Sequence, residues 1–262
     1  MIDTCGFPKD GYFYYRAAWT DEPVLHICSH WDYEDGDMVT LLVYSNCSSV
    51  ELFVNGKSFG RKYAGPPFQR TVEQNPTGEN FKGNTTRRTF RWTIPYERGY
   101  VKAIGMFADG KSGMPITDTV WTSEAPASLR LRRCPFNEDS GQIIYMICEI
   151  FDQKGHRCLN AELDILWSYD KSTLKLKALD SGDQLSEEPF QGGNHRKTCA
   201  GRCIAIFEWI AEENCQIRIS THGLPDAVCT VERSKKADIQ EPEHTENRKR
   251  AYHAAQDLTQ NP

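Results

Sequence analysis

The sequence predicts an all-β protein: two immunoglobulin-like antiparallel β-sandwiches in tandem, preceded by one short helix. Three observations predict this fold class. Short runs of apolar and alternating residues recur along residues 23–232, with turn-forming residues between them. About seven such runs fall in each of two stretches of roughly 100 residues, which is typical of β-sandwiches. A helical pattern precedes the first run.

The helix is predicted over Asp10–Trp19. Pro8 stands just before it, and proline is tolerated in the first turn, where the acidic Asp10 also suits the helix dipole. Tyr12, Tyr15 and Trp19 recur at helical spacing and therefore share one face. A single helix of this length is marginal alone, so it needs a partner surface.

The first predicted sandwich contains a strong hairpin signal, Asn55-Gly56, between two of its runs. Phe90, Trp92 and Ile94 alternate with polar residues, as expected of a half-buried strand. The predicted strands are Val24–Cys28, Met38–Ser45, Val50–Val54, Ser58–Lys62, Thr89–Ile94, Tyr100–Phe107 and Ile116–Trp121.

A short polar joint at Ser123–Pro126 leads to a second series of runs. Its predicted strands are Ser128–Arg133, Gln142–Phe151, Leu163–Tyr169, Leu174–Leu179, Arg202–Trp209, Cys215–Thr221 and Ala227–Glu232. The expected segments are therefore a helix at 1–21, sandwiches at 22–123 and 124–233, and a charged tail at 234–262 that is disordered or partly helical.

Charge and composition exclude several partners. Lys and Arg number 31 against 36 Asp and Glu, and the net charge of -5 argues against nucleic-acid binding. No apolar run is long enough to cross a bilayer, so no membrane partner is expected. The 10 cysteines fall largely in apolar runs, and we interpret them as buried free thiols, with scattered disulfides and a metal site as the alternatives. Localisation stays open, although free thiols favour a reducing compartment such as the cytoplasm.

The sequence offers no catalytic constellation, and we assign no catalytic residue, no metal ligand and no cofactor. The common hydrolase, metalloprotease and nucleotide-binding motifs are absent. Asp180-Ser181-Gly182-Asp183 invites a calcium hypothesis, but it lacks the spacing of a calcium loop and favours a plain turn. His195 falls in a predicted polar loop, where we expect no role for it.

The densest cluster of aromatic and imidazole side chains comprises His26, His30, Trp31 and Tyr33. Aromatic faces and histidine donors can form a sugar-binding platform, so Trp31, Tyr33 and His30 are the candidate carbohydrate-binding residues. The competing interpretation is packing in the core or at the rim of the sandwich.

Several stretches carry a resemblance to a known family. The opening Gly6–Asp10 with the aromatic helix, continuing through Pro23–His26 to His30-Trp31, strongly resembles glycoside hydrolase family 2 enzymes of the β-galactosidase type where the catalytic (β/α)8 barrel ends and a β-sandwich begins. The stretches that extend this likeness are Tyr44–Cys47, Val50–Gly60, Tyr96, Gly99-Tyr100, Lys102-Ala103, Leu179–Asp183, Pro189–Gly192 and Gly201-Arg202. Ser181 stands where the family pattern has asparagine.

The resemblance implies that this chain is a non-catalytic C-terminal portion of a retaining glycosidase, with residues 1–21 a remnant of the last barrel helix. The two catalytic glutamates of the family would lie in a barrel missing from this chain, so the chain alone is expected to be inactive. The implied partners are that barrel, carbohydrate through the parent enzyme, and a second copy in a homo-oligomer. The alternatives are a carbohydrate-binding module and a cell-surface adhesion module.

Overall fold

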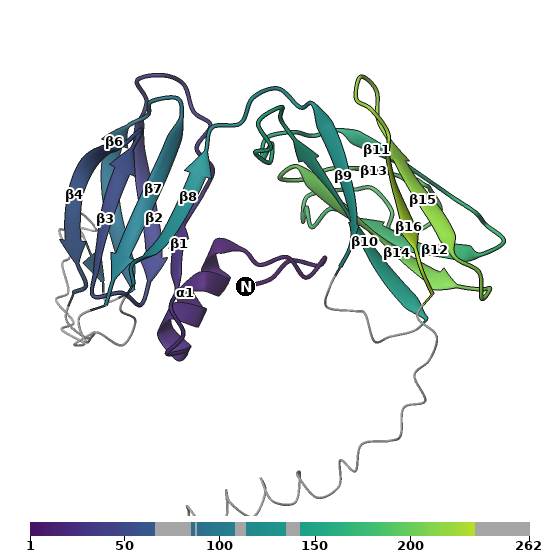
Figure 1. The fold of residues 1–262 in the computed structure, drawn as a ribbon, viewed down its shortest axis with the longest axis horizontal. Coiled ribbons are helices and arrows are strands. Elements are labelled where there is room, and N and C mark those ends of the chain that lie inside the picture. The colour runs from purple at the N-terminus through teal and green to yellow at the C-terminus, as the bar shows by residue number, and fades with distance from the viewer. Residues whose placement is uncertain (66–84, 87, 108–113, 135–141, 234–262) are drawn as a thin grey trace, which may run out of the picture.

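Four antiparallel sheets and one helix make up the described part of the chain, which is residues 1–65, 85–86, 88–107, 114–134 and 142–233 of a computed structural model. The sheets form two sandwiches, one after the other along the chain (Figure 1). The predicted fold class is therefore confirmed. Among the described residues, no helix is both long enough and apolar enough to cross a lipid bilayer.

The first sandwich pairs a sheet of order β1-β2-β6-β5 with a sheet of order β4-β3-β7-β8. Its strands are β1 Leu25–Ile27, β2 Met38–Ser45, β3 Ser49–Val54, β4 Lys57–Tyr63, β5 Thr85–Thr86, β6 Thr89–Pro95, β7 Tyr100–Met106 and β8 Ile116–Trp121. In β6, Phe90, Trp92 and Ile94 are buried between the sheets, as their alternation predicts. Asn55 and Gly56 both have positive φ, which is the conformation of the predicted two-residue hairpin between β3 and β4.

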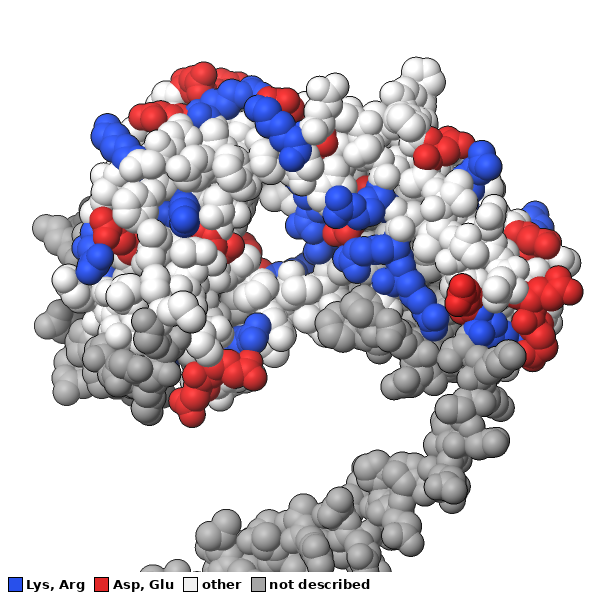
Figure 2. Space-filling view, viewed as in Figure 1, with Lys and Arg blue, Asp and Glu red and all other residues white. Residues whose placement is uncertain are grey.

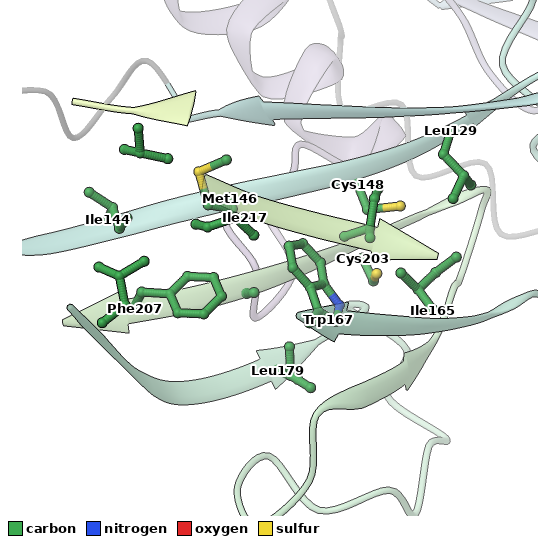
Figure 3. Close-up of a cluster of buried hydrophobic side chains, with 14 of the residues drawn as sticks. Leu129, Ile144, Met146, Cys148, Ile165, Trp167, Leu179, Cys203, Phe207 and Ile217 are labelled. Carbon is green, nitrogen blue, oxygen red and sulfur yellow. The ribbon is translucent and has the colours of Figure 1, made fainter. Parts of the chain in front are cut away.

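The second sandwich pairs a sheet of order β12-β14-β10-β9 with a sheet of order β13-β11-β15-β16. Its strands are β9 Ser128–Arg133, β10 Ile143–Phe151, β11 Asp164–Tyr169, β12 Leu174–Asp180, β13 His195–Lys197, β14 Arg202–Trp209, β15 Cys215–Ser220 and β16 Ala227–Val231. Trp167, Phe207 and Ile217 point into the space between the two sheets (Figure 3). Their full burial makes this core the main source of stability for the second half of the chain.

Helix α1, Asp10–Trp19, packs on the first sandwich through one face. The Phe13 ring stacks on His26 with 3.8 Å between ring centroids, and Ala17 is fully buried. The opposite face carries Tyr12, Tyr15 and Trp19, all exposed, with Trp19 at 71%. The helix is therefore confirmed, and the partner surface it was expected to need is the first sandwich. Among the described residues, nothing covers its aromatic face.

Residues Met1–Lys9, here called the N-terminal segment, lie against the other sandwich. Phe7 forms a small buried cluster with Ile147 of β10 and Ile204 of β14, on the outer face of that sheet. The N-terminal segment leads directly into α1, which packs on the first sandwich. The segment and the helix together therefore contact both sandwiches, and Figure 1 shows them between the two.

The two sandwiches also contact each other directly at the joint between β8 and β9. The rings of Trp121 and His156 stack with 4.6 Å between centroids and 8° between planes. Lys154 Nζ lies 2.7 Å from Glu124 Oε1. The expected boundaries at 21/22, 123/124 and 233/234 stay predictions.

The predicted strands match the observed ones closely, but β5 and β13 were not predicted. Each has only two or three residues and contains no apolar alternation, because both are made of polar side chains. The tail expected to be disordered, 234–262, lies outside the described residues. All ten cysteines are free, six of them buried, which agrees with the interpretation as free thiols.

Candidate functional site

A cavity of about 510 Å³ lies where α1, the N-terminal segment and both sandwiches meet. We call it the junction cavity. Its side chains come from three places in the sequence: Asp10 and Phe13 of α1, His26, His30 and Asp118 of the first sandwich, and Arg157 and Arg202 of the second. One wall is thus acidic and imidazole-bearing, and the other is basic.

His26 organises the acidic wall. Its Nε2 lies 2.7 Å from Asp10 Oδ1, and its Nδ1 lies 3.9 Å from Asp118 Oδ2. Asp118 also accepts a hydrogen bond from the backbone N–H of Ile27 at 2.7 Å. Both carboxylates therefore contact the same imidazole, one at each ring nitrogen.

The three predicted sugar-binding residues are not brought together on one surface. Trp31 is 0% exposed, and its indole N–H donates to the carbonyl of Glu97 at 3.1 Å, so it belongs to the core. His30 and Tyr33 are half-buried and stack on each other with 4.6 Å between centroids. His30 lines the junction cavity. The sugar-binding assignment stays a prediction, and the structure leaves Trp31 no exposed face for it.

Arg202 organises the basic wall. Its guanidinium carbon lies 3.8 Å from the ring centroid of Phe7, and its Nη2 is 3.9 Å from Asp3 Oδ2. Burial, together with the nearby charge of Arg157, lowers the pKa of Arg202. Even so, a guanidinium stays charged at neutral pH. This wall of the cavity therefore carries a permanent positive charge beside the N-terminal segment.

The turn at Asp180–Gly182 binds the N-terminal segment. The Asp180 carboxylate accepts hydrogen bonds from Thr4 Oγ1 at 2.6 Å and from the backbone N–H groups of Ser181 and Gly182 at 2.7 and 3.0 Å. Burial opposes ionisation, but these donors hold the pKa of Asp180 below its ordinary value of 3.8. Gly182 has φ +74°, and a Cβ there would lie 2.5 Å from Asp3 Oδ2. The geometry thus supports the plain turn over the calcium loop, because the carboxylate is already occupied by donors.

Two groups of side chains in the described part of the chain have metal-ligand geometry. The donor atoms of Asp10, His26 and Cys28 lie within 4.8 Å of one another. Burial and the charge of Asp10 raise the pKa of the Cys28 thiol, which disfavours the thiolate that a metal needs.

The second group is Asp164, Glu188 and His195. His195 was expected to lie in a loop, and this placement is wrong; the expectation that it has no role stays a prediction. It begins strand β13, and its Nδ1 lies 3.1 Å from Asp164 Oδ1 on the paired strand β11. The Asp164 and His195 side chains are both exposed, as is usual for a solvated ion pair.

Sequence reasoning assigned no role to Arg157, Arg196 or Arg202. Arg202 lies in Gly201-Arg202, one of the stretches that carry the family resemblance. Its position at the start of an apolar strand could have marked it as a candidate, because a charged residue there must find a partner. Arg196 is 1% exposed, yet only the tertiary structure shows which carbonyls surround it. Arg157 carries no local signal.

Comparison with known proteins agrees with this fold. The family described as "Domain of unknown function (DUF4982)" matches residues 36–113. The chain is 27% identical over 236 residues to the β-galactosidase BoGH2A of Bacteroides ovatus, a match covering 88% of this chain and 25% of that protein. It is 32% identical over 162 residues to a β-glucuronidase of Formosa agariphila, covering 60% of this chain and 14% of that one.

A crystal structure of a β-glycosidase from Bacteroides vulgatus superimposes with a TM-score of 0.72 at 25% identity, over 88% of this chain and 27% of that chain. The chain therefore spans about a quarter of the length of the β-galactosidase and of this β-glycosidase. The sequence similarity over most of its length and the shared pair of sandwiches support the identification of this chain as a fragment similar to glycoside hydrolase family 2 enzymes.

Proposed function

We propose that this chain is a non-catalytic accessory region of a family 2 glycoside hydrolase, and that it supports the catalytic barrel of the whole enzyme. The whole enzyme would hydrolyse a β-galactoside or β-glucuronide, the substrates in the names of two relatives. The two catalytic glutamates would lie outside these 262 residues.

The observation that carries this proposal is the exposed aromatic face of α1. Phe13 and Ala17 pack one face of the helix against the first sandwich. The rings of Tyr15 and Trp19, on the other face, contact each other at a tilt of 46° with 4.8 Å between centroids and remain exposed. A helix that is apolar on both faces is typical of an element between two layers. The barrel would be the second layer.

Activity measurements test the non-catalytic role. The purified chain should release no p-nitrophenol from p-nitrophenyl β-galactoside or β-glucuronide above the uncatalysed rate. If the chain is produced in a host that lacks glycosidases and hydrolysis still co-purifies with it, the proposal is overturned.

Dye binding tests the exposed face. An environment-sensitive apolar dye should bind the wild-type chain, and Trp19→Ser should lower that fluorescence markedly because it removes the largest exposed ring of the helix. Phe190→Ser is the matched control, since Phe190 is also exposed but lies in the second sandwich. Equal losses in both variants would contradict a specific apolar surface on α1.

The carbohydrate-binding module is the alternative function. His30 supports it by lining the junction cavity and stacking on Tyr33. The burial of Trp31 removes the broadest ring that such a platform would have used. Calorimetry with galactosides that shows saturable heat, abolished by Tyr33→Ala, would favour this alternative.

A further inference from the structure

A second cavity, of about 550 Å³, lies between the N-terminal segment and the outer face of β10 and β14. We call it the arginine pocket. The stretch Cys5–Pro8 forms one side, and Tyr145, Ile147 and Ile204 form an apolar floor. Its charged side chains are Arg132, Arg157, Arg202 and Glu149. Lys and Arg side chains gather on this part of the second sandwich, beside the space between the sandwiches (Figure 2).

The charges in the arginine pocket do not balance. Arg132 Nε donates to Glu149 Oε2 at 2.8 Å, and Arg157 Nη1 lies 3.5 Å from Oε1 of the same carboxylate. Burial alone would raise the pKa of Glu149, but the hydrogen bonds and charges of these two arginines lower it below its ordinary value. One carboxylate thus faces three guanidiniums. Asp3 approaches Arg202 only at 3.9 Å, so the pocket keeps a net positive charge.

Two of the guanidiniums, those of Arg157 and Arg202, have few partners in the pocket. The Arg202 side chain is 17% exposed, stacks on the Phe7 ring and approaches the Asp3 carboxylate only at 3.9 Å. Arg157 Nε is buried and has no hydrogen-bond partner among the described residues. A buried donor without an acceptor, such as Arg157 Nε, is costly, and an oxyanion bound between the two guanidiniums would offset part of the unpaired positive charge.

We propose that the arginine pocket binds the carboxylate of a small ligand, held by Arg157 and Arg202. A guanidinium matches the geometry of a carboxylate because its parallel N–H groups donate to both oxygens. Tyr145 and Ile147 offer an apolar surface for the rest of the ligand, and the volume lies in the range of about 300–1,000 Å³ usual for small-molecule sites. A sugar acid has both the carboxylate and an apolar ring face, so this is the ligand class.

Calorimetric titration of the full chain at low salt tests the proposal. Glucuronate should bind saturably at concentrations up to about 10 mM, whereas glucose, which has the same ring without the carboxylate, should not bind. Inorganic sulfate is the third probe. If sulfate binds as tightly as glucuronate, the pocket accepts any oxyanion and the sugar-acid assignment is wrong.

Three variants locate the binding. Arg157→Gln should lower the affinity for glucuronate at least about tenfold. Arg218→Gln, which changes an exposed arginine of β15 outside the pocket, should leave this affinity unchanged. Glu149→Gln removes the competing carboxylate and should tighten binding. If Glu149→Gln and Arg157→Gln weaken it equally, the loss reflects disruption of the pocket, and the proposal fails. It also fails if no probe gives saturable heat.

Discussion

Arg196 is the residue whose replacement tests the second sandwich most directly. It lies on β13, and its side chain is 1% exposed. Nη2 donates to the carbonyls of Leu179 and Pro189, both at 2.6 Å, and Nη1 donates to the carbonyl of Glu188 at 3.1 Å. One guanidinium therefore holds the end of β12 and the loop that follows it, which carries the turn that binds the N-terminal segment.

Replacing Arg196 with Met keeps much of the buried stem and removes all three donors. The carbonyl of Leu179 is buried and would lose its partner at a cost of about 1–3 kcal/mol, and the two part-buried carbonyls would lose about 0.5–1.5 kcal/mol each. Removing the buried charge recovers part of this. We expect Arg196→Met to lower the free energy of unfolding by about 3 kcal/mol.

The assay is urea unfolding followed by hydrogen exchange with mass spectrometry, which separates the sandwiches. Peptides from β14 should show a midpoint lowered by about 1.5 M, taking a urea slope of about 2 kcal/mol/M. Peptides from β2 serve as the internal reference. Arg218→Met is the matched control, because its ion pair with Asp226 is exposed and worth under about 1 kcal/mol. A shift in Arg196→Met no larger than in the control would refute the reasoning.

Further predictions concern the turn at Asp180–Gly182, the loss of stability at acidic pH and the reactivity of a buried cysteine. Gly182→Ala should destabilise the chain more than Gly223→Ala, because the new methyl group at residue 182 must displace the Asp3 side chain. Gly223 is the matched control, since it has a similar positive φ and open space around it, and calorimetric melting of both variants measures the difference. Because the pKa of Asp180 is lowered, its contribution is complete above the ordinary value of 3.8 and is lost as the pH falls below it, so Asp180→Asn should flatten the acid limb of a stability–pH curve. Burial raises the pKa of Cys203, so native alkylation followed by mass spectrometry should leave it unmodified until the chain unfolds.

The fold could be predicted from the sequence because most strands carry their own pattern. β15 alternates buried Cys215, Ile217 and Ile219 with exposed residues, as a strand with one covered face must. The strand β10 departs from this pattern, with five consecutive buried residues. The reason is tertiary: Phe7, some 140 residues earlier, covers Ile147 on the outer face.

The candidate sites could not be predicted in the same way. The junction cavity and the arginine pocket are each assembled from segments distant in the chain, and nothing local to Arg157 or Asp118 marks them as neighbours of the N-terminal segment. The aromatic cluster at His30–Tyr33 was the strongest local signal, and it is divided between the core and the cavity. Local composition reports that a side chain is bulky, whereas burial decides whether it can bind.

The arginine pocket and the docking of the N-terminal segment are thermodynamically linked. Cys5–Pro8 forms a side of the pocket, so the pocket exists only while the segment lies on β10 and β14. A ligand that binds there must therefore stabilise the docked segment. By the same coupling, a variant that releases the segment must lower the affinity for the ligand. Since α1 follows the segment without a break and packs on the first sandwich, occupancy of the pocket would also restrict the helix that we propose as the contact with the catalytic barrel.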